Sequence, residues 1–418
     1  MATLILTVGG SHQPILASIQ HNRPDHVIFI CSEDRGKSPG SHIQVTGSGN
    51  VLSSKAGLEK PDLPNIVTLA NLAPESFQMI KIDHFDDLNA CYLASIQAIE
   101  QARAAHPREP VIIDYTGGTK SMTAGLAAAA LDDGRCTFSL VVGRRTDLVK
   151  VQDRSEYVRP LPVLKVQMHR NWRAANELLA RFDYRGAELI LSQAAARYAS
   201  EETRGLVENG MALCRGFDAW DRFDHALARQ ALEPLAKDFL NHWRNLKILA
   251  GEARGHNFEL VEDLCLNAER RHLQGRNDDA VGRLYRALEL TAQVWLQQHY
   301  EISTGNVLLE KVPSSHQAKL SRFAVADDSE KEPTIKIALL QAWDLIAAFP
   351  DDPLGKHFMD HRSFLVNFLS VRNFSLFAHG TNPIHERDYR SYSGRINSFL
   401  TTCLNLAVPP KLRSVPFT

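Results

Sequence analysis

An arginine and a histidine near the carboxyl end of the chain are of the types that RNA cleavage requires. Arg372 and His379 have six residues between them and enclose the run Asn-Phe-Ser-Leu-Phe-Ala. An imidazole can move protons to or from a 2′-hydroxyl or a leaving 5′-oxygen, and a guanidinium can stabilise charge on a pentavalent phosphorane. One copy supplies a single imidazole, so two copies across a twofold axis would supply both an acid and a base. The same pair would also fit an exposed arginine and a helix-terminal histidine, and this alternative stays open.

A single long helix is expected to position this pair. Residues from about 356 to 379 have helical composition, and Gly380 and Pro383 stand where such a helix would end. Seven residues make almost two helical turns. Arg372 and His379 are therefore expected to project from the same face.

Two glycine-rich turns follow strand-like segments in the first third of the chain. The apolar run 3–8 leads into Gly9-Gly10-Ser11-His12-Gln13, and the run 111–114 leads into Tyr115-Thr116-Gly117-Gly118-Thr119-Lys120. Glycines let a backbone approach an anion, and the free amides at a helix N-terminus favour negative charge. Two such junctions in one parallel sheet predict a crevice for a nucleotide. The two threonines and the lysine favour a phosphate or ribose ligand over bare turns.

Known phosphate motifs fit these turns poorly. Gly9-Gly10-Ser11 is not G-x-G-x-x-G, and Gly118-Thr119-Lys120-Ser121 imitates only the tail of a P-loop. Thr119 stands where a P-loop requires glycine, and Asp114 stands where its first glycine belongs. Hydrolysis of a nucleoside triphosphate is therefore disfavoured, and two ordinary tight turns of an α/β domain stay open as an alternative.

The elements that must hold the glycine turns alternate in type. Short strands rich in Val, Ile and Phe are predicted at 3–8, 26–31, 111–114 and 137–142, with helical segments at 14–21, 85–105 and 121–131. Continuous apolar strands separated by helices predict a parallel sheet covered on both faces, which is a Rossmann-like α/β domain. The segment 32–64, rich in Ser, Gly and Lys, is expected to be a surface loop.

The rest of the chain is expected to be all-α and to end in a helical bundle. Helical segments follow at 172–181, 187–198, 203–221 and 235–253. A long amphipathic helix is predicted over 279–300, where one stripe is formed by Val281, Leu284, Tyr285, Leu288, Ala292 and Trp295. The segment 303–334 is polar and contains two prolines, so we expect a loop insertion there.

Composition places the chain among globular proteins and narrows its partners. The 418 residues carry 47 basic and 48 acidic side chains, a net charge of −1, so a polyanion would bind in a local groove. The six cysteines form no Cys-x-x-Cys pair, which argues against a zinc ribbon or a disulfide framework and predicts a cytoplasmic protein. No apolar stretch approaches the roughly 18 residues that a membrane span needs, so no membrane partner is expected.

Two further groups have ordinary as well as functional interpretations. His357 and His361 have the i, i+4 spacing of metal ligands, but the glutamate of H-E-x-x-H and a third ligand are missing, so no metal site is expected. On the long helix, Glu289 is expected to form an exposed ion pair with Arg286, or to hold Arg372 if the two helices pack together.

Together these features resemble the CARF–HEPN ribonucleases that accompany type III CRISPR systems. CARF is a Rossmann-like sensor, and HEPN is a helical nuclease domain marked by R-x(4–6)-H. The resemblance rests on Thr7 to Ser11, on Asp114 to Lys120 and on Arg372 to His379, in the order that the family shows. Residues 279–290 also resemble the family's first nuclease helix. The middle of the chain, about 165–260, matches only as helical.

This resemblance implies a homodimer with an allosteric activator. It implies a CARF-like sensor at 1–165, a helical linker at 166–260 and a HEPN ribonuclease domain at 261–418. Paired sensors would bind a cyclic oligoadenylate, and binding would switch on metal-independent cleavage of single-stranded RNA, leaving a 2′,3′-cyclic phosphate. No cofactor is implied besides this activator. Some members of the family also cleave the activator itself, and Lys120 and the neighbouring threonines could orient a 2′-hydroxyl for that reaction.

The resemblance also assigns roles to residues. Arg372 and His379 would be catalytic, and Asn373 would assist or orient them. The activator would be contacted by Gly9, Gly10, Ser11 and Gln13 from the first junction and by Thr116, Gly117, Gly118, Thr119 and Lys120 from the second. Ser32, Arg144 and Arg145 are weaker ligand candidates, for which a loop serine and solvated arginines are the more ordinary interpretations.

A non-catalytic alternative is a cyclic-nucleotide sensor whose helical half binds DNA or protein. It would need a basic recognition helix, which we do not find, so no stable DNA binding is expected. RNA cleavage would distinguish the two functions.

Overall fold

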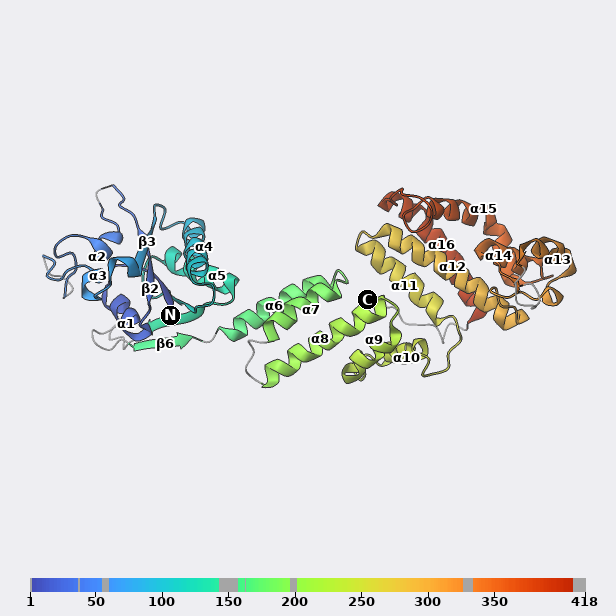
Figure 1. The fold of residues 1–418 in the computed structure, drawn as a ribbon, viewed down its shortest axis with the longest axis horizontal. Coiled ribbons are helices and arrows are strands. Elements are labelled where there is room, and N and C mark those ends of the chain that lie inside the picture. Colours follow the sequence, from blue (N-terminus) through green and yellow to red (C-terminus); the bar gives the residue numbers. More distant parts are fainter. Residues whose placement is uncertain are drawn as a thin grey trace. The chain divides into compact units, whose positions relative to one another are not determined.

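The computed structural model describes residues 2–36, 38–54, 60–142, 157–161, 163–195, 201–325 and 334–408. The chain divides into two compact units, Met1–Arg170 and Asn171–Thr418 (Figure 1). Each unit has its own hydrophobic core, and we describe each by itself. No helix of the described residues is both long and apolar enough to cross a membrane.

The first unit is built on a six-stranded sheet with the order β3-β2-β1-β4-β5-β6. Its strands are β1 (Thr3–Thr7), β2 (His26–Ser32), β3 (Phe77–Ile82), β4 (Val111–Asp114), β5 (Thr137–Val142) and β6 (Tyr157–Leu161). Neighbours among the first five are parallel, and β6 is antiparallel to β5. The predicted Rossmann-like fold is confirmed, with a mixed rather than a purely parallel sheet.

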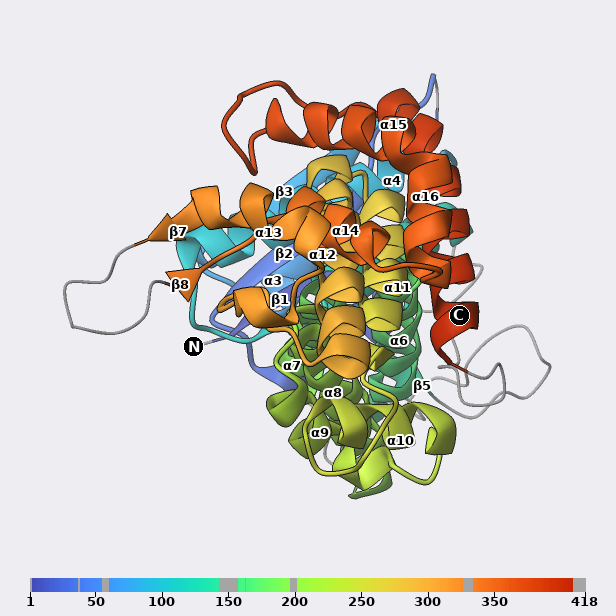
Figure 2. The same cartoon turned by 90° about the vertical axis from the view of Figure 1, so that its right-hand side faces the viewer.

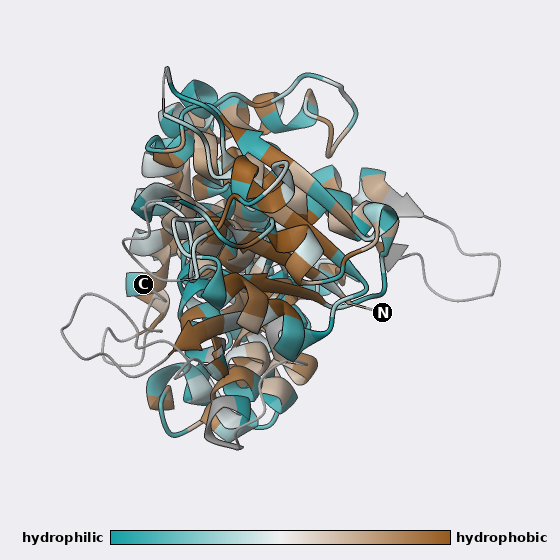
Figure 3. Ribbon diagram, turned by 90° about the vertical axis from the view of Figure 1, so that its left-hand side faces the viewer, coloured by the Kyte–Doolittle hydropathy of each residue, from teal (hydrophilic) through white to brown (hydrophobic). Residues whose placement is uncertain are grey.

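Helices cover both faces of this sheet. One face packs against α1 (Gln13–Asn22), α2 (His42–Thr46) and α3 (Ile66–Leu69), and the other packs against α4 (Leu88–Ala105) and α5 (Lys120–Asp133). Leu4 and Leu6 of β1 face the first set of helices and Ile5 faces the second, because successive side chains of a strand point to opposite faces. The central strands are accordingly the hydrophobic part of the unit in Figure 3.

The segment 32–64 is not the plain surface loop that its composition predicts. It contains α2 and an antiparallel bridge between Leu52 and Leu63, and its residues 37 and 55–59 lie outside the described part. Val45 and Leu52 are buried in the core beside α1. A five-residue helix with one buried side chain is too short to produce a periodic sequence pattern.

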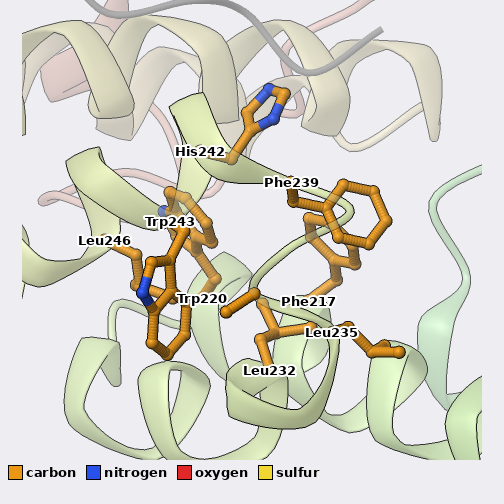
Figure 4. Close-up of a pocket in the computed structure, with 9 residues that line it drawn as sticks. Phe217, Trp220, Leu232, Leu235, Phe239, His242, Trp243 and Leu246 are labelled. Carbon is orange, nitrogen blue, oxygen red and sulfur yellow. The ribbon is translucent and has the colours of Figure 1, made fainter.

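The second unit begins with helices that pack around aromatic side chains. They are α6 (Leu164–Leu179), which contains the boundary, α7 (Tyr184–Ala195), α8 (Glu201–Asp221), α9 (His225–Leu232) and α10 (Leu240–Leu249). Phe217, Trp220, Phe239 and Trp243 line a small apolar pocket with neighbouring leucines (Figure 4). The Trp220 side chain is buried.

A buried ionic cluster joins these helices to the rest of the unit. The carboxylate of Asp221, at the end of α8, accepts hydrogen bonds from Asn267 Nδ2 at 2.6 Å, Arg270 Nε at 2.9 Å and Arg271 Nη2. All three donors belong to α11 (Glu259–Leu273). A buried carboxylate needs such compensation, so this cluster fixes α8 against α11.

Helices α11 and α12 (Asn277–Tyr300) open the last bundle, followed by α13 (Ser314–Leu320), α14 (Leu339–Ala348), α15 (Pro353–Asn373) and α16 (Glu386–Ala407). Figure 2 shows α11, α12 and α16 side by side, with α15 lying across them. The predicted stripe of α12 is confirmed at Leu284, Leu288 and Trp295, which are buried in the bundle core. Two short strands, β7 (Ala324–Val325) and β8 (Thr334–Ile335), pair in antiparallel orientation. Short 3₁₀ helices lie at Pro74–Ser76, Glu233–Leu235, Leu309–Lys311 and Ser321–Phe323.

Two sequence predictions for this bundle are wrong. The segment 303–334 is not a simple loop insertion, since it contains α13 and its residues Val307, Val312 and Leu320 are buried in the bundle core. The helix predicted from about 356 to 379 is also too long at its C-terminal end. It ends at Asn373, and α16 follows it.

Candidate functional site

The structure brings the two glycine turns of the first unit together. They follow β1 and β4, which are neighbours in the sheet, whereas the chain leaves β1 toward β2 on the other side. This is the point of an α/β sheet at which ligands bind, outside the carboxyl ends of the strands. A Cβ on Gly9 would lie 2.5 Å from the backbone nitrogen of Gly118, and one on Gly117 would lie 2.5 Å from the Thr7 carbonyl oxygen. The glycines are therefore needed for the two turns to pack against each other.

The predicted threonine ligands use their hydroxyls inside the turn. Thr116 Oγ1 donates to the Asp114 carboxylate at 2.5 Å and accepts from the Val141 backbone nitrogen at 2.8 Å. Thr119 Oγ1 donates to the Phe85 carbonyl at 2.7 Å and accepts from the Met122 nitrogen at 3.2 Å, which caps α5. Both hydroxyls stabilise the turn, so a ligand at these positions would contact backbone groups and not the threonine hydroxyls.

Other residues of the two junctions are open. Gly10, Ser11 and Lys120 are exposed and Gln13 is half-buried. Around a Cβ placed on Gly10 there is no atom within 4 Å. Lys120 begins α5 and forms no ion pair with the described residues, so its charge is available to an anion at the helix N-terminus.

A buried carboxyl lies beneath this surface. Asp114 ends β4 and is 2% exposed. Burial raises the pKa of Asp114, against the hydrogen bonds that it accepts from Ser18 and Thr116. Of the weaker candidates, Ser32 exchanges hydrogen bonds with Ser41 and so closes its own loop. Arg144 and Arg145 lie outside the described residues.

In the second unit, the helix that carries Arg372 ends earlier than predicted. α15 ends at Asn373, and Phe374 is its C-cap. The backbone nitrogen and the hydroxyl of Ser375 donate to the Arg372 carbonyl at 3.0 and 2.7 Å, which satisfies the end of the helix. His379 therefore does not share a helix face with Arg372, and that prediction is wrong. It lies in the loop 374–385.

The loop 374–385 nevertheless returns His379 toward the helix end. The His379 nitrogen donates to the Asn373 carbonyl at 3.2 Å, and the Asn382 nitrogen donates to the Phe374 carbonyl at 3.1 Å. A Cβ on Gly380 would lie 2.0 Å from the Phe374 carbonyl oxygen. Gly380 is therefore required by this close approach, and it is not the C′ residue of the helix. A folded loop, and not helical periodicity, brings the backbone of His379 back to Asn373, the residue after Arg372.

Arg372 is held by an aromatic ring that the sequence did not indicate as its partner. Its guanidinium carbon lies 4.2 Å from the centroid of the Tyr285 ring on α12, and Nη1 donates to Asn373 Oδ1 at 3.3 Å. The hypothesis that Glu289 holds Arg372 is wrong, because the Glu289 carboxylate accepts from Arg286 at 2.5 Å. Burial, together with Glu289, raises the pKa of Tyr285, and the Arg372 charge opposes this shift.

Three large apolar residues lie between Arg372 and His379 in the sequence. Phe374, Leu376 and Phe377 are 62%, 66% and 53% exposed. His379 is exposed as well. Exposed apolar side chains grouped in one loop are typical of interaction surfaces.

The start of α15 is fixed by a carboxylate that sequence analysis missed. Asp352 caps the helix by accepting from the Gly355 nitrogen at 2.7 Å. Its other oxygen accepts from Trp295 Nε1 at 2.9 Å and from the Tyr300 hydroxyl at 2.6 Å, both on α12. The aspartate before Pro353 was a signal for a helix start. α12 thus holds α15 at both ends.

The histidine pair on α15 has ordinary partners. His357 Nε2 lies 3.3 Å from the Phe399 carbonyl oxygen, and the two rings stack at 4.6 Å. His361 Nδ1 lies 3.0 Å from the His357 carbonyl oxygen. Among the described residues, no group of three or more His, Cys, Asp or Glu side chains could hold a metal ion.

Comparison with known proteins agrees with this architecture. Residues 251–402 match the family model of the Csm6 HEPN domain. Csm6 of Enterococcus italicus, solved bound to cyclic hexa-2′-fluoro-hexa-dAMP, superposes with a TM-score of 0.59 at 13% identity, covering 99% of this chain and 96% of that one. The match to Can2 from Sulfobacillus thermosulfidooxidans, in complex with cyclic tetra-adenylate (cA4), covers 56% of this chain and 68% of that one at 12% identity, with a TM-score of 0.24.

No curated protein matches the chain by sequence. The family match covers the segment that contains α11 to α15, Arg372, Asn373 and His379. The fold likeness extends over both units. The chain therefore resembles Csm6 in fold over both units, and its residues 251–402 match the family model of the Csm6 HEPN domain.

Proposed function

We propose that this protein is an endoribonuclease that cleaves single-stranded RNA when a cyclic oligoadenylate occupies its first unit. The observation that carries the proposal is the end of α15, in a domain of the Csm6 HEPN family. There, Arg372 has no ion pair among the described residues, His379 is exposed, and the loop 374–385 folds the His379 backbone back to Asn373, the residue after Arg372. Both side chains are left free for a substrate.

The chemistry follows from these two groups. The 2′-oxygen of RNA attacks the adjacent phosphorus while a histidine takes its proton, and the bond from phosphorus to the 5′-oxygen breaks. The leaving oxygen takes a proton from an imidazolium, and the products are a 2′,3′-cyclic phosphate and a 5′-hydroxyl. Arg372 stabilises the charge of the phosphorane, and Asn373 orients Arg372 through its side-chain oxygen. No step in this scheme uses a metal ion.

A homodimer completes the site in this proposal. Each chain supplies one His379, and two copies supply the base and the acid. The exposed side chains of Phe374, Leu376 and Phe377 beside the pair support such a contact, since its apolar surface would be covered by a second copy.

The activator site is proposed at the two glycine turns. Backbone groups of Gly9, Gly10, Gly117 and Gly118, with the exposed side chains of Ser11, Gln13 and Lys120, would contact a cyclic oligoadenylate. Thr116 and Thr119 would act through their backbone, because their hydroxyls are engaged. The similarity to a Csm6 that was solved with a cyclic hexanucleotide analogue supports this class of ligand.

The test is a cleavage assay on a labelled single-stranded RNA with tetra- and hexa-adenylate rings side by side, in EDTA. We expect one ring to raise the rate and Arg372→Ala or His379→Ala to lower the activated rate by about 10²–10⁴-fold. Chromatography of the ring after the reaction reports whether the first unit also cleaves its activator. Binding of a ring without cleavage under any condition would reject the ribonuclease and leave the non-catalytic sensor.

A further inference from the structure

The positive charge of Arg372 is held in place without being neutralised. With the described residues, Arg372 forms no ion pair, and its guanidinium donates one hydrogen bond, the 3.3 Å bond to Asn373 Oδ1. Its Nε is buried and has no hydrogen-bond partner there. The group that contacts its face is the ring of Tyr285, at 4.2 Å from the guanidinium carbon. A ring face attracts a cation through its quadrupole and carries no net charge of its own.

This arrangement suits a group that must bind a phosphorane. A carboxylate partner would orient the guanidinium but would also compete with phosphate oxygens for its N–H groups. Glu289 lies one turn along α12 from Tyr285, and its carboxylate is occupied by Arg286 at 2.5 Å. Arg286 also donates to Gln293 at 3.0 Å. The Glu289 carboxylate is thus paired with Arg286 and does not neutralise Arg372.

The Tyr285 ring extends from a part of α12 that is packed into the bundle core. Its neighbours Leu284 and Leu288 are fully buried in the bundle core, which fixes the backbone of α12. The loop 374–385 is attached to the same helix, because the Ile384 nitrogen donates to Asp278 Oδ2 at 3.2 Å. α12 therefore contacts both Arg372 and the loop that carries His379, and positions both.

We propose that Tyr285 is the positioning residue of the cleavage site. Its ring face holds the Arg372 guanidinium in the orientation that stabilises the phosphorane and leaves the whole charge for the substrate. Tyr285 touches no reacting atom and acts through Arg372. The inference rests on the proposed ribonuclease function.

The test compares Tyr285→Leu, which removes the ring face, with Tyr285→Phe, which removes only the hydroxyl. We expect Tyr285→Leu to lower kcat about tenfold to thirtyfold with little change in KM, because the lost interaction acts on the transition state. Tyr285→Phe is expected to keep kcat within about twofold of wild type. A Tyr285→Leu enzyme with wild-type kcat, or a Tyr285→Phe enzyme as slow as Tyr285→Leu, would overturn the proposal.

Phe364→Leu is the matched control for lost packing. Arg395 stacks on the ring of Phe364 at 3.8 Å, so this variant removes an arginine–ring contact of the same kind from α15 without touching Arg372. We expect it to lower the melting temperature and leave kcat near wild type. An equal loss of kcat in Phe364→Leu would show that any loosening of the bundle slows the enzyme and would reject a specific role of Tyr285.

A second measurement does not depend on activity. The melting temperatures of Tyr285→Leu, Arg372→Ala and the double variant form a cycle, and we expect the double variant to melt no lower than Tyr285→Leu alone. Additive losses would overturn the stacking. If the wild type cleaves no RNA with any ring, the proposed function fails, and the cycle still decides whether Tyr285 holds Arg372.

Discussion

The two candidate sites use their polar side chains in opposite ways. At the glycine turns of the first unit, the hydroxyls of Thr116 and Thr119 form hydrogen bonds within the fold. The groups left accessible to a ligand are mostly backbone groups and small side chains. At the end of α15, the fold is held by backbone bonds and one ring, and Arg372 and His379 are left open. The first site is therefore suited to recognition by shape and backbone amides, and the second is suited to chemistry by side chains.

Because of this difference, substitutions at the first site are expected to affect folding, whereas substitutions at the second site are expected to affect catalysis. Changes at Gly9 or Gly117 in the first site disturb the packing of the turns, since the glycines are in contact across them. Changes at Arg372 or His379 remove reactive groups and leave the backbone bonds of the loop 374–385 in place. The following predictions test this contrast.

The largest effect is expected from the side chains of the second site. Arg372→Ala and His379→Ala should each lower the activated cleavage rate by about 10²–10⁴-fold, the usual range for a lost proton-transfer or charge-stabilising group. Binding of the cyclic oligoadenylate, measured by calorimetry, should stay at the wild-type level. A variant that keeps about a tenth of the wild-type rate would contradict the assignment.

Gly380→Ala should slow cleavage almost as strongly without removing a reactive group. The new Cβ would lie 2.0 Å from the Phe374 carbonyl oxygen, so the loop 374–385 must open and His379 must move. A displacement of about 1 Å can cost about 10²-fold in rate. Gly394→Ala on α16 is the matched control, because a Cβ there meets no atom within 4 Å. Equal rates for both variants would exclude a role of the folded loop.

At the first site, substitutions of two adjacent glycines should have different effects, one on stability and the other on activator binding. Gly9→Ala places a Cβ 2.5 Å from the Gly118 nitrogen and should lower the free energy of unfolding by about 1–3 kcal/mol. Gly10→Ala meets no atom within 4 Å and should leave stability unchanged but weaken activator binding. Thermal melts and calorimetry on both variants check this. Wild-type affinity in Gly10→Ala would mean that the activator does not approach this turn.

The smallest effect concerns the buried carboxyl under the turns. Burial raises the folded-state pKa of Asp114, so its contribution to stability is present below the unfolded-state pKa of about 3.9 and is lost as pH rises through the folded-state pKa. Asp114→Asn removes this loss. We expect the melting temperature of Asp114→Asn to fall less than that of the wild type as pH rises from about 4 to 7. Parallel pH profiles would contradict this.

Elements with strong apolar patterns were predictable from the sequence. The strands β1, β2, β4 and β5 and the stripe of α12 follow directly from runs of buried aliphatic residues. β3 and β6 lacked such a pattern, because β3 is interrupted by Gln78 and Lys81 and is mostly half-buried, and β6 contains Arg159 and Pro160. α16 carried a helical signal at Tyr389, Ile396, Phe399 and Cys403, which sequence analysis did not use.

The candidate site residues were selected by residue type, whereas their contacts depend on tertiary structure. The run from Asn373 to His379 is compatible with a helix at every position, and only the bonds of Ser375 to the Arg372 carbonyl show where the helix ends. The same holds for Tyr285, which the pattern assigned to the core stripe. Its role beside Arg372 depends on how α15 crosses α12, and no local pattern encodes that crossing.

The folded loop after Asn373 has a consequence for how this motif tolerates insertions and deletions. On a continuous helix, removing one residue from the spacer would rotate everything beyond it by about 100° and carry the histidine to another side. A loop that is attached at Gly380 and Ile384 can lose or gain a residue in its outer curve while both attachments stay in place. Spacer length in such a motif is thus free to drift while the chemistry is retained.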